Sequence, residues 1–168
     1  MKRLLPVLAL IIVSLVACKA SEPIPPDVSN GTYILGERRI TLALDLFEEP
    51  VAPGSAAKAS IRLLNARAIG DLDGDGKLDA SVVLAHNPGG SGTFYYLAAY
   101  LGDGNGGGVA TPAIPLGDRV AIEAVGIASS RITLRMLDRK PGEPFTTEPS
   151  VRLTRVFEVK AGALSEVK

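Results

Sequence analysis

Four aspartates recur at short intervals in one segment of the chain, and carboxylates in this arrangement could bind a cation. Calcium is a hard cation that takes six to eight oxygen ligands, and carboxylates at positions 1, 3 and 5 of a tight loop converge on one point. Gly76, at position 6 of the segment 71–79, permits the sharp turn, and the backbone carbonyl at position 7 supplies another oxygen. The sequence therefore predicts a Ca²⁺ site with these ligands: Asp71, Asp73, Asp75, Lys77 and Asp79.

Two other interpretations of this segment make different predictions. A helix–loop–helix calcium site would need a bidentate glutamate at position 12, where the chain has Val82, so the segment is not an EF-hand. The second alternative is a solvated acidic turn that binds nothing. It would leave four carboxylates to repel one another with Lys77 as the nearby counter-ion, so the spacing favours calcium.

The loop resembles the Asp-rich β-loop of FG-GAP and VCBS-type repeats, in which the same spacing joins two strands. Residues 80–85, which follow the loop, are short and rich in β-branched side chains, as the resemblance requires. Such repeats recur to build a propeller, whereas this chain has one clear copy. More broadly, three segments (70–76, 90–96 and 138–144) resemble a group of uncharacterised small bacterial lipoproteins. The resemblance to the repeats implies calcium in the loop. The resemblance to the lipoproteins implies no activity.

The first residues predict export and lipid attachment. Lys2 and Arg3 precede an apolar run over residues 4–16, which is shorter than the roughly 20 residues that a membrane span needs. The run ends in a segment, 15–18, that resembles a bacterial lipobox and implies cleavage before Cys18 and acylation of its thiol, for example with palmitate. An ordinary secretory signal with a chance cysteine is the alternative. Cys18 is the only cysteine, so no structural disulfide is expected.

Removing the expected signal peptide, residues 1–17, leaves 151 of the 168 residues, which suits one domain. Without Lys2 and Arg3, 16 basic side chains face 18 acidic ones, so the net charge is −2 and nucleic acid is not an expected partner. The expected partners are a membrane, reached through the lipid, and an unknown envelope protein or glycan. Lys19 after the cysteine favours an outer-membrane location facing the periplasm over inner-membrane retention.

The rest of the chain predicts an all-β fold. Residues 18–31 are rich in proline and small polar residues and predict an extended tether, with the β domain over 32–168. Strict apolar–polar alternation over 39–46 and 131–136 predicts half-buried strands. The side chains expected to be buried are Ile40, Leu42, Leu44, Ile132, Leu134 and Met136, and those expected to be exposed are Arg39, Arg131 and Arg135.

Two further segments complete the expected architecture. Residues 93–101 are apolar on both sides of the alternation and predict a central strand covered on both faces. Residues 56–64 are the one segment that could be helical. With turn signals between roughly seven to nine strands, these patterns predict a single antiparallel β-sandwich or a small barrel.

Enzymatic chemistry is not expected. His86 precedes Ser91 by five residues, but the glycines around Ser91 miss the nucleophile-elbow pattern because Thr93 stands where glycine is needed. The segment from Ser91 to Tyr95 also resembles the Ser-Gly-x-x-Tyr loop of periplasmic C-type lysozyme inhibitors, which are small β-barrel lipoproteins. The aromatic-Lys-Gly half of their pattern is missing after Tyr100. A binding or structural role remains the main hypothesis, and lysozyme inhibition through Ser91 and Tyr95 the alternative.

Overall fold

The computed structural model describes residues 22–167, which contain twelve β-strands, one 3₁₀ helix and no α-helix. No helix in this part of the chain is long and apolar enough to cross a membrane. In chain order the elements are η1 (Val28–Asn30), β1 (Thr32–Leu35), β2 (Arg38–Thr41), β3 (Leu46–Pro50), β4 (Lys58–Gly70), β5 (Asp79–Asn87), β6 (Phe94–Gly102), β7 (Gly108–Ala110), β8 (Ile114–Asp118), β9 (Ala121–Ala128), β10 (Arg131–Asp138), β11 (Val151–Lys160) and β12 (Ala163–Glu166).

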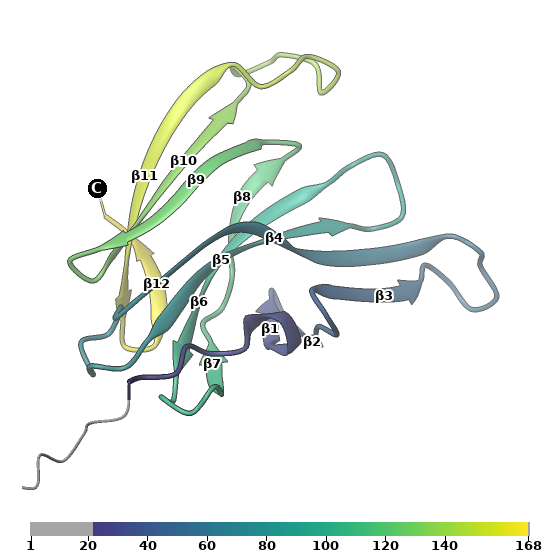
Figure 1. Cartoon of the computed structure of the whole chain (residues 1–168). Coiled ribbons are helices and arrows are strands. Elements are labelled where there is room, and N and C mark those ends of the chain that lie inside the picture. Colours follow the sequence, from purple (N-terminus) through teal and green to yellow (C-terminus); the bar gives the residue numbers. More distant parts are fainter. Residues whose placement is uncertain (1–21, 168) are drawn as a thin grey trace, which may run out of the picture.

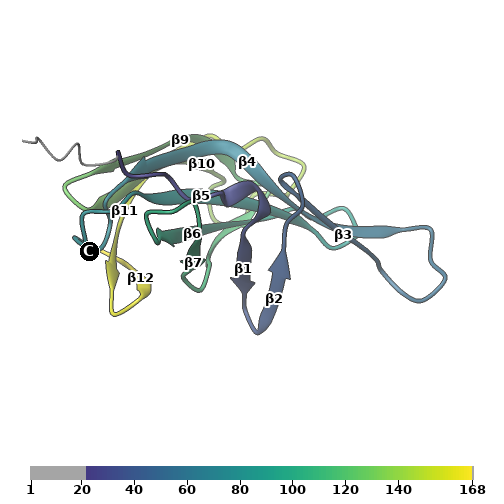
Figure 2. The same cartoon turned by 60° about the horizontal axis from the view of Figure 1, so that its bottom comes forward.

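A six-stranded sheet forms the middle of the molecule, in the order β3-β4-β5-β6-β7, with β8 also paired to β6. The four-stranded sheet β12-β11-β10-β9 packs on one face of it, and the β1–β2 hairpin packs on the other (Figures 1 and 2). All strand pairs within these sheets are antiparallel. The sheets of the described residues stay open, so the sandwich-like architecture forms and the small barrel does not.

Each face of the middle sheet has its own core, because alternate side chains of a strand point to opposite faces. Along β5, Val82 and Leu84 enter one core while Val83 enters the other. The first core cluster, under the hairpin, contains Val28, Tyr33, Ile40, Leu42, Ile61, Leu63, Ala80, Val82, Leu84, Ala98, Tyr100 and Ala110. The second core cluster, under the four-stranded sheet, contains Leu72, Val83, Leu97, Ala99, Leu116, Val120, Ile132, Leu134, Met136 and Phe157.

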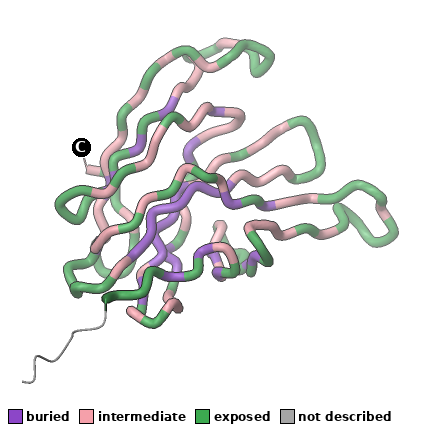
Figure 3. Tube along the Cα trace, viewed as in Figure 1, coloured by how far each residue is buried: buried purple, intermediate pink, exposed green. Residues whose placement is uncertain are grey.

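The central strand expected over 93–101 is confirmed as β6. Its residues Leu97 to Tyr100 are all buried and alternate between the two clusters, and buried segments run through the middle of the molecule in Figure 3. The strand expected over 131–136 is also confirmed, as β10. Its side chains Ile132, Leu134 and Met136 are buried and Arg131 and Arg135 are exposed.

The strand expected over 39–46 is wrong in its second half. Ile40 and Leu42 are buried and Arg39 is exposed, but the chain turns after β2, and Leu44 is 82% exposed instead of buried. Leu44 and Asp45 adopt positive φ values of 53° and 70°. The turn is held from outside, because the backbone N–H of Asp45 donates to the carbonyl of Ser29 at 2.9 Å, and β3 then begins a new pairing.

Residues 56–64 are not helical. They lead into β4, a strand of 13 residues that pairs with β3 on one side and β5 on the other. Over residues 60–62, both edges of its backbone are occupied by paired neighbouring strands. Tertiary pairing of this kind overrides the weak helix propensity of an alanine-containing segment.

The tether expected over residues 18–31 is wrong for residues 24–31, and its residues 18–21 lie outside the described part of the chain. Ile24 forms a parallel bridge with Asn105, and Val28 is buried in the first core cluster. The hydroxyl of Tyr33 donates to the carbonyl of Val28 at 2.7 Å, which fixes this segment against the domain. The domain therefore begins before residue 32.

Candidate metal centre

The Asp-rich segment is the loop that joins β4 to β5. Gly70, the last residue of β4, pairs with Asp79, the first residue of β5, so the loop closes on a regular ladder. Leu72 is its inward anchor, since this side chain is 2% exposed and belongs to the second core cluster. The sequence interpretation missed this role, although Leu72 is the one apolar residue between Asp71 and Lys77. Burial of Leu72 fixes the loop relative to both sheets.

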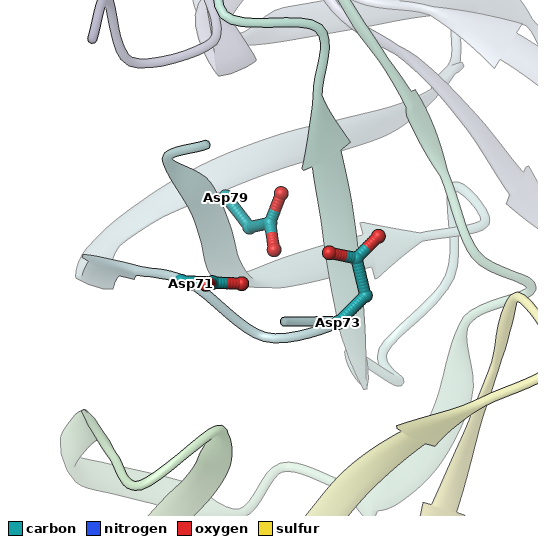
Figure 4. A group of neighbouring side chains, drawn as sticks. All are labelled: Asp71, Asp73 and Asp79. Atoms are coloured by element: carbon teal, nitrogen blue, oxygen red, sulfur yellow. The ribbon is translucent and has the colours of Figure 1, made fainter. Parts of the chain in front are cut away.

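Three of the predicted ligands converge. Carboxylate oxygens of Asp71, Asp73 and Asp79 lie within 4.8 Å of one another, and Figure 4 shows the three side chains arranged around a common space. Asp79 is fully buried, Asp71 is half-buried and Asp73 is exposed. The cluster is therefore enclosed on the Asp79 side and accessible from solvent on the Asp73 side.

Asp79 connects the loop to the neighbouring hairpin. Its Oδ2 accepts a hydrogen bond from the backbone N–H of Leu72 at 2.7 Å, and its Oδ1 accepts one from Gly102 at 2.8 Å. Burial raises the pKa of Asp79 above its ordinary value against the lowering effect of these bonds, and the nearby charges of Asp73 and Asp75 raise the pKa further. A cation beside this carboxylate would offset the cost of keeping it ionised.

Asp71 organises the turn of the loop. Its Oδ1 accepts from the backbone N–H of Gly74 at 2.7 Å, and its Oδ2 accepts from Gly76 at 3.1 Å. Both glycines have left-handed backbone angles, with φ of 83° and 80°. Glycine adopts these angles without the penalty that a side chain would impose, so Gly76 has the turn-forming role that the sequence predicts.

Asp75 lies outside the cluster of three carboxylates. Its Oδ2 accepts a hydrogen bond from Lys77 Nζ at 2.6 Å, and this contact lowers the pKa of Asp75 below its ordinary value. The backbone carbonyl of Lys77 as a ligand stays a prediction. The adjacent turn between β6 and β7 is stabilised by hydrogen bonds within itself. Asp103 Oδ1 accepts from the backbone N–H groups of Asn105 and Gly107.

The donor set fits a metal ion, and a hard one. All three converging groups are carboxylates, and neither histidine nor cysteine is among them. Oxygen donors of this kind suit calcium, magnesium or manganese and are poor ligands for softer metals. Backbone N–H groups already orient Asp71 and Asp79, so the carboxylates are positioned without help from an ion.

The other predicted site residues lie elsewhere. Cys18 is outside the described residues. Ser91 is exposed in the loop before β6, and Tyr95 is half-buried on β6 and packs against the second core cluster. Within the described part of the chain no hydrogen bond joins His86 to Ser91.

Comparison with known proteins identifies no relative: no family model, no curated protein and no solved structure matches the chain. The chemistry of this chain is therefore argued from its own residues.

Proposed function

We propose that the chain is a cell-envelope lipoprotein, anchored through Cys18, whose β domain holds one calcium ion in the loop 71–79 and has a binding or structural role without catalysis. The convergence of Asp71 and Asp73 on the fully buried carboxylate of Asp79 is the observation that carries the calcium proposal. The anchor rests on the signal-peptide and lipobox pattern. We propose an outer-membrane location facing the periplasm because Lys19 follows the cysteine.

Calcium is favoured over magnesium by the nature of the loop. Magnesium demands near-ideal octahedral geometry and keeps several of its waters, whereas calcium accepts six to eight oxygens in irregular arrangements. Asp71, Asp73 and Asp79 would hold the ion, and the carbonyl of Lys77 and water would complete its ligands. All protein ligands come from one loop without a glutamate at position 12, so the affinity we expect is that of extracellular modules, about 10⁻⁴–10⁻³ M.

Calcium should raise the melting temperature of the domain. An ion that binds only the native state stabilises it by about 1.4 kcal/mol at ten times the dissociation constant, which corresponds to roughly 3–6 °C for a domain of this size. Thermal melts at increasing calcium, paired with titration calorimetry, measure the effect. Asp71→Asn should abolish it, and Asp75→Asn should reduce it less, because Asp75 is held by Lys77 outside the cluster.

Asp103→Asn is the matched control for the charge removed. It deletes one negative charge from the neighbouring turn and retains a side-chain oxygen acceptor, so its melting response to calcium should equal that of the unmodified protein. Absence of any response at millimolar calcium would refute the proposal, as would an Asp71→Asn variant that responds normally.

Substitution of Cys18 should move the protein out of the membrane fraction. If the thiol carries the lipid, Cys18→Ser removes the acyl chains that supply the hydrophobic binding energy, about 0.8 kcal/mol per buried CH₂. Fractionation of bacteria that express the full chain, with mass spectrometry of the mature N-terminus, tests this. An unmodified N-terminus at another residue contradicts the anchor. So does normal processing of the Cys18→Ser protein if both this variant and the unmodified protein are released from the membrane fraction.

Lysozyme inhibition is not expected. Tyr95 packs against the second core cluster, and the aromatic-Lys-Gly half of the inhibitor pattern is missing from the sequence. Hydrolysis of peptidoglycan by a C-type lysozyme should proceed at the same rate with and without an equimolar amount of the domain. Suppression that disappears in Ser91→Ala would instead establish the alternative function.

A further inference from the structure

A cavity of about 310 Å³ lies between the β1–β2 hairpin and the six-stranded sheet. Its apolar walls come from six residues of five strands and one connecting segment: Leu35, Ile40, Ile61, Tyr96, Ala113 and Pro115. Arg38 and His86 are its polar lining residues with charged or titratable side chains. The cavity continues the first core cluster outward, since Ile40 and Ile61 belong to that cluster. It is thus a recess of the apolar core that is partly open to solvent.

The cavity exists because the hairpin covers its end of the sheet incompletely. Each strand of the hairpin has four residues, and the turn between them contains Gly36 with a φ of 61°. A Cβ atom at Gly36 would meet no heavy atom within 4 Å. Gly36, which lines the cavity together with His86, therefore contributes no side chain that would fill it.

His86 presents an unused imidazole to this space. It lies on β5 two residues beyond Leu84, so it shares the sheet face that forms the first core cluster. The ring is half-buried and makes no hydrogen bond with any described residue. Burial and the nearby charge of Arg38 lower the pKa of His86 below its ordinary value, against the raising effect of Glu49, so the neutral form of the ring is favoured at pH 7. A neutral imidazole offers one donor and one acceptor.

The charged groups at the edge of the cavity balance one another. Arg38 Nη2 lies 2.7 Å from Glu49 Oε1; Arg38 is exposed and Glu49 is half-buried. A ligand carboxylate would have to compete with Glu49 for the guanidinium and would be repelled by the Glu49 charge. The apolar walls likewise penalise burial of an ion. The site therefore favours an uncharged ligand.

We propose that this cavity binds a small, uncharged, mainly apolar molecule with one hydroxyl group, which forms one hydrogen bond with His86. A hydroxyl can either donate or accept, so it can pair with either nitrogen of the neutral imidazole. An apolar cavity of about 150 Å³ holds a benzene ring, so the volume here suits a ligand of about two rings. His86 lies seven residues along β5 from Asp79, about 23 Å away at 3.3 Å per residue, and the site does not depend on the metal cluster.

The probe that tests this is 2-naphthol, a bicyclic hydroxyl compound of the required size. All residues that form or pack against the two core clusters lie between Val28 and Leu164. The segment from residue 22 onward therefore contains the described core and serves as the protein sample. His86 is the only histidine, and its ring protons are identified directly by NMR. Both ring-proton signals should shift and saturate as 2-naphthol is added.

Three comparisons decide the proposal. His86→Ala should weaken 2-naphthol binding about fivefold, the loss of one hydrogen bond. Ala113→Leu should fill the cavity and weaken binding more than tenfold, whereas the same change at the exposed residue Ala128 on β9 should have no effect. The anion 2-naphthoate should bind at least tenfold more weakly than 2-naphthol.

The same measurements can overturn it. Unmoved His86 signals at millimolar 2-naphthol, in the unmodified protein, exclude a site at this cavity whatever the variants do. Binding that persists in a folded Ala113→Leu protein places the ligand elsewhere. Equal affinity for 2-naphthoate refutes the uncharged class of ligand.

Discussion

Asp79→Ala is expected to lower the free energy of unfolding of the metal-free domain by about 2–4 kcal/mol. Asp79 is fully buried, and its two oxygens accept the backbone N–H groups of Leu72 and Gly102. Alanine leaves both donors without a partner, which costs more than the desolvation of the carboxylate that is relieved. The calcium response should vanish as well. Denaturant unfolding in the presence of a chelator, and then with calcium, separates the two losses.

Ser81→Ala provides the matched control on the same strand. Ser81 is as fully buried as Asp79 and lies two residues further along β5, but its hydroxyl has no hydrogen-bond partner in the described structure. Removing that hydroxyl should leave stability unchanged or raise it by about 1 kcal/mol. If Asp79→Ala is as well tolerated as Ser81→Ala, Asp79 does not support the loop in the way its contacts indicate.

The sequence predicted the strands whose two faces differ. In β10 one face enters the second core cluster and the other meets solvent, so Ile132 and Leu134 alternate with polar residues and the pattern suffices. It failed at Leu44, because the turn there uses positive φ at residues other than glycine and is held by Ser29, which is distant in sequence. Contacts of that kind leave no local signature.

In the metal cluster, too, the sequence predicted the features that spacing sets and missed those that depend on particular contacts. Spacing alone predicted that Asp71 and Asp73 converge, since both belong to one turn. Spacing did not predict that Lys77 would hold Asp75 away, or that Asp79 would accept a hydrogen bond from Gly102, which depends on β6 lying beside β5. The cavity at His86 was also beyond sequence reasoning, because its walls come from separate strands.

Gly102→Ala is expected to destabilise the domain by about 2–3 kcal/mol and to weaken calcium binding at the same time. A Cβ atom at Gly102 would lie 2.1 Å from the backbone carbonyl oxygen of Leu78, so the end of β6 must move away from the loop. That movement breaks the Gly102 hydrogen bond to Asp79 and frees one side of the carboxylate that encloses the cluster.

Gly126→Ala is the control for a glycine in a strand. Gly126 lies in β9, and a Cβ atom there would meet no heavy atom within 4 Å. Alanine should therefore be neutral or stabilise the domain by about 0.4–1 kcal/mol, because it lowers the conformational entropy of the unfolded chain. Thermal melts of both variants with and without calcium make the comparison. Stability and calcium response that stay unchanged in Gly102→Ala would mean that the close contact with Leu78 and the link to Asp79 do not hold the site. A loss of stability with a normal calcium response would separate the two and assign to Gly102 a role in packing alone.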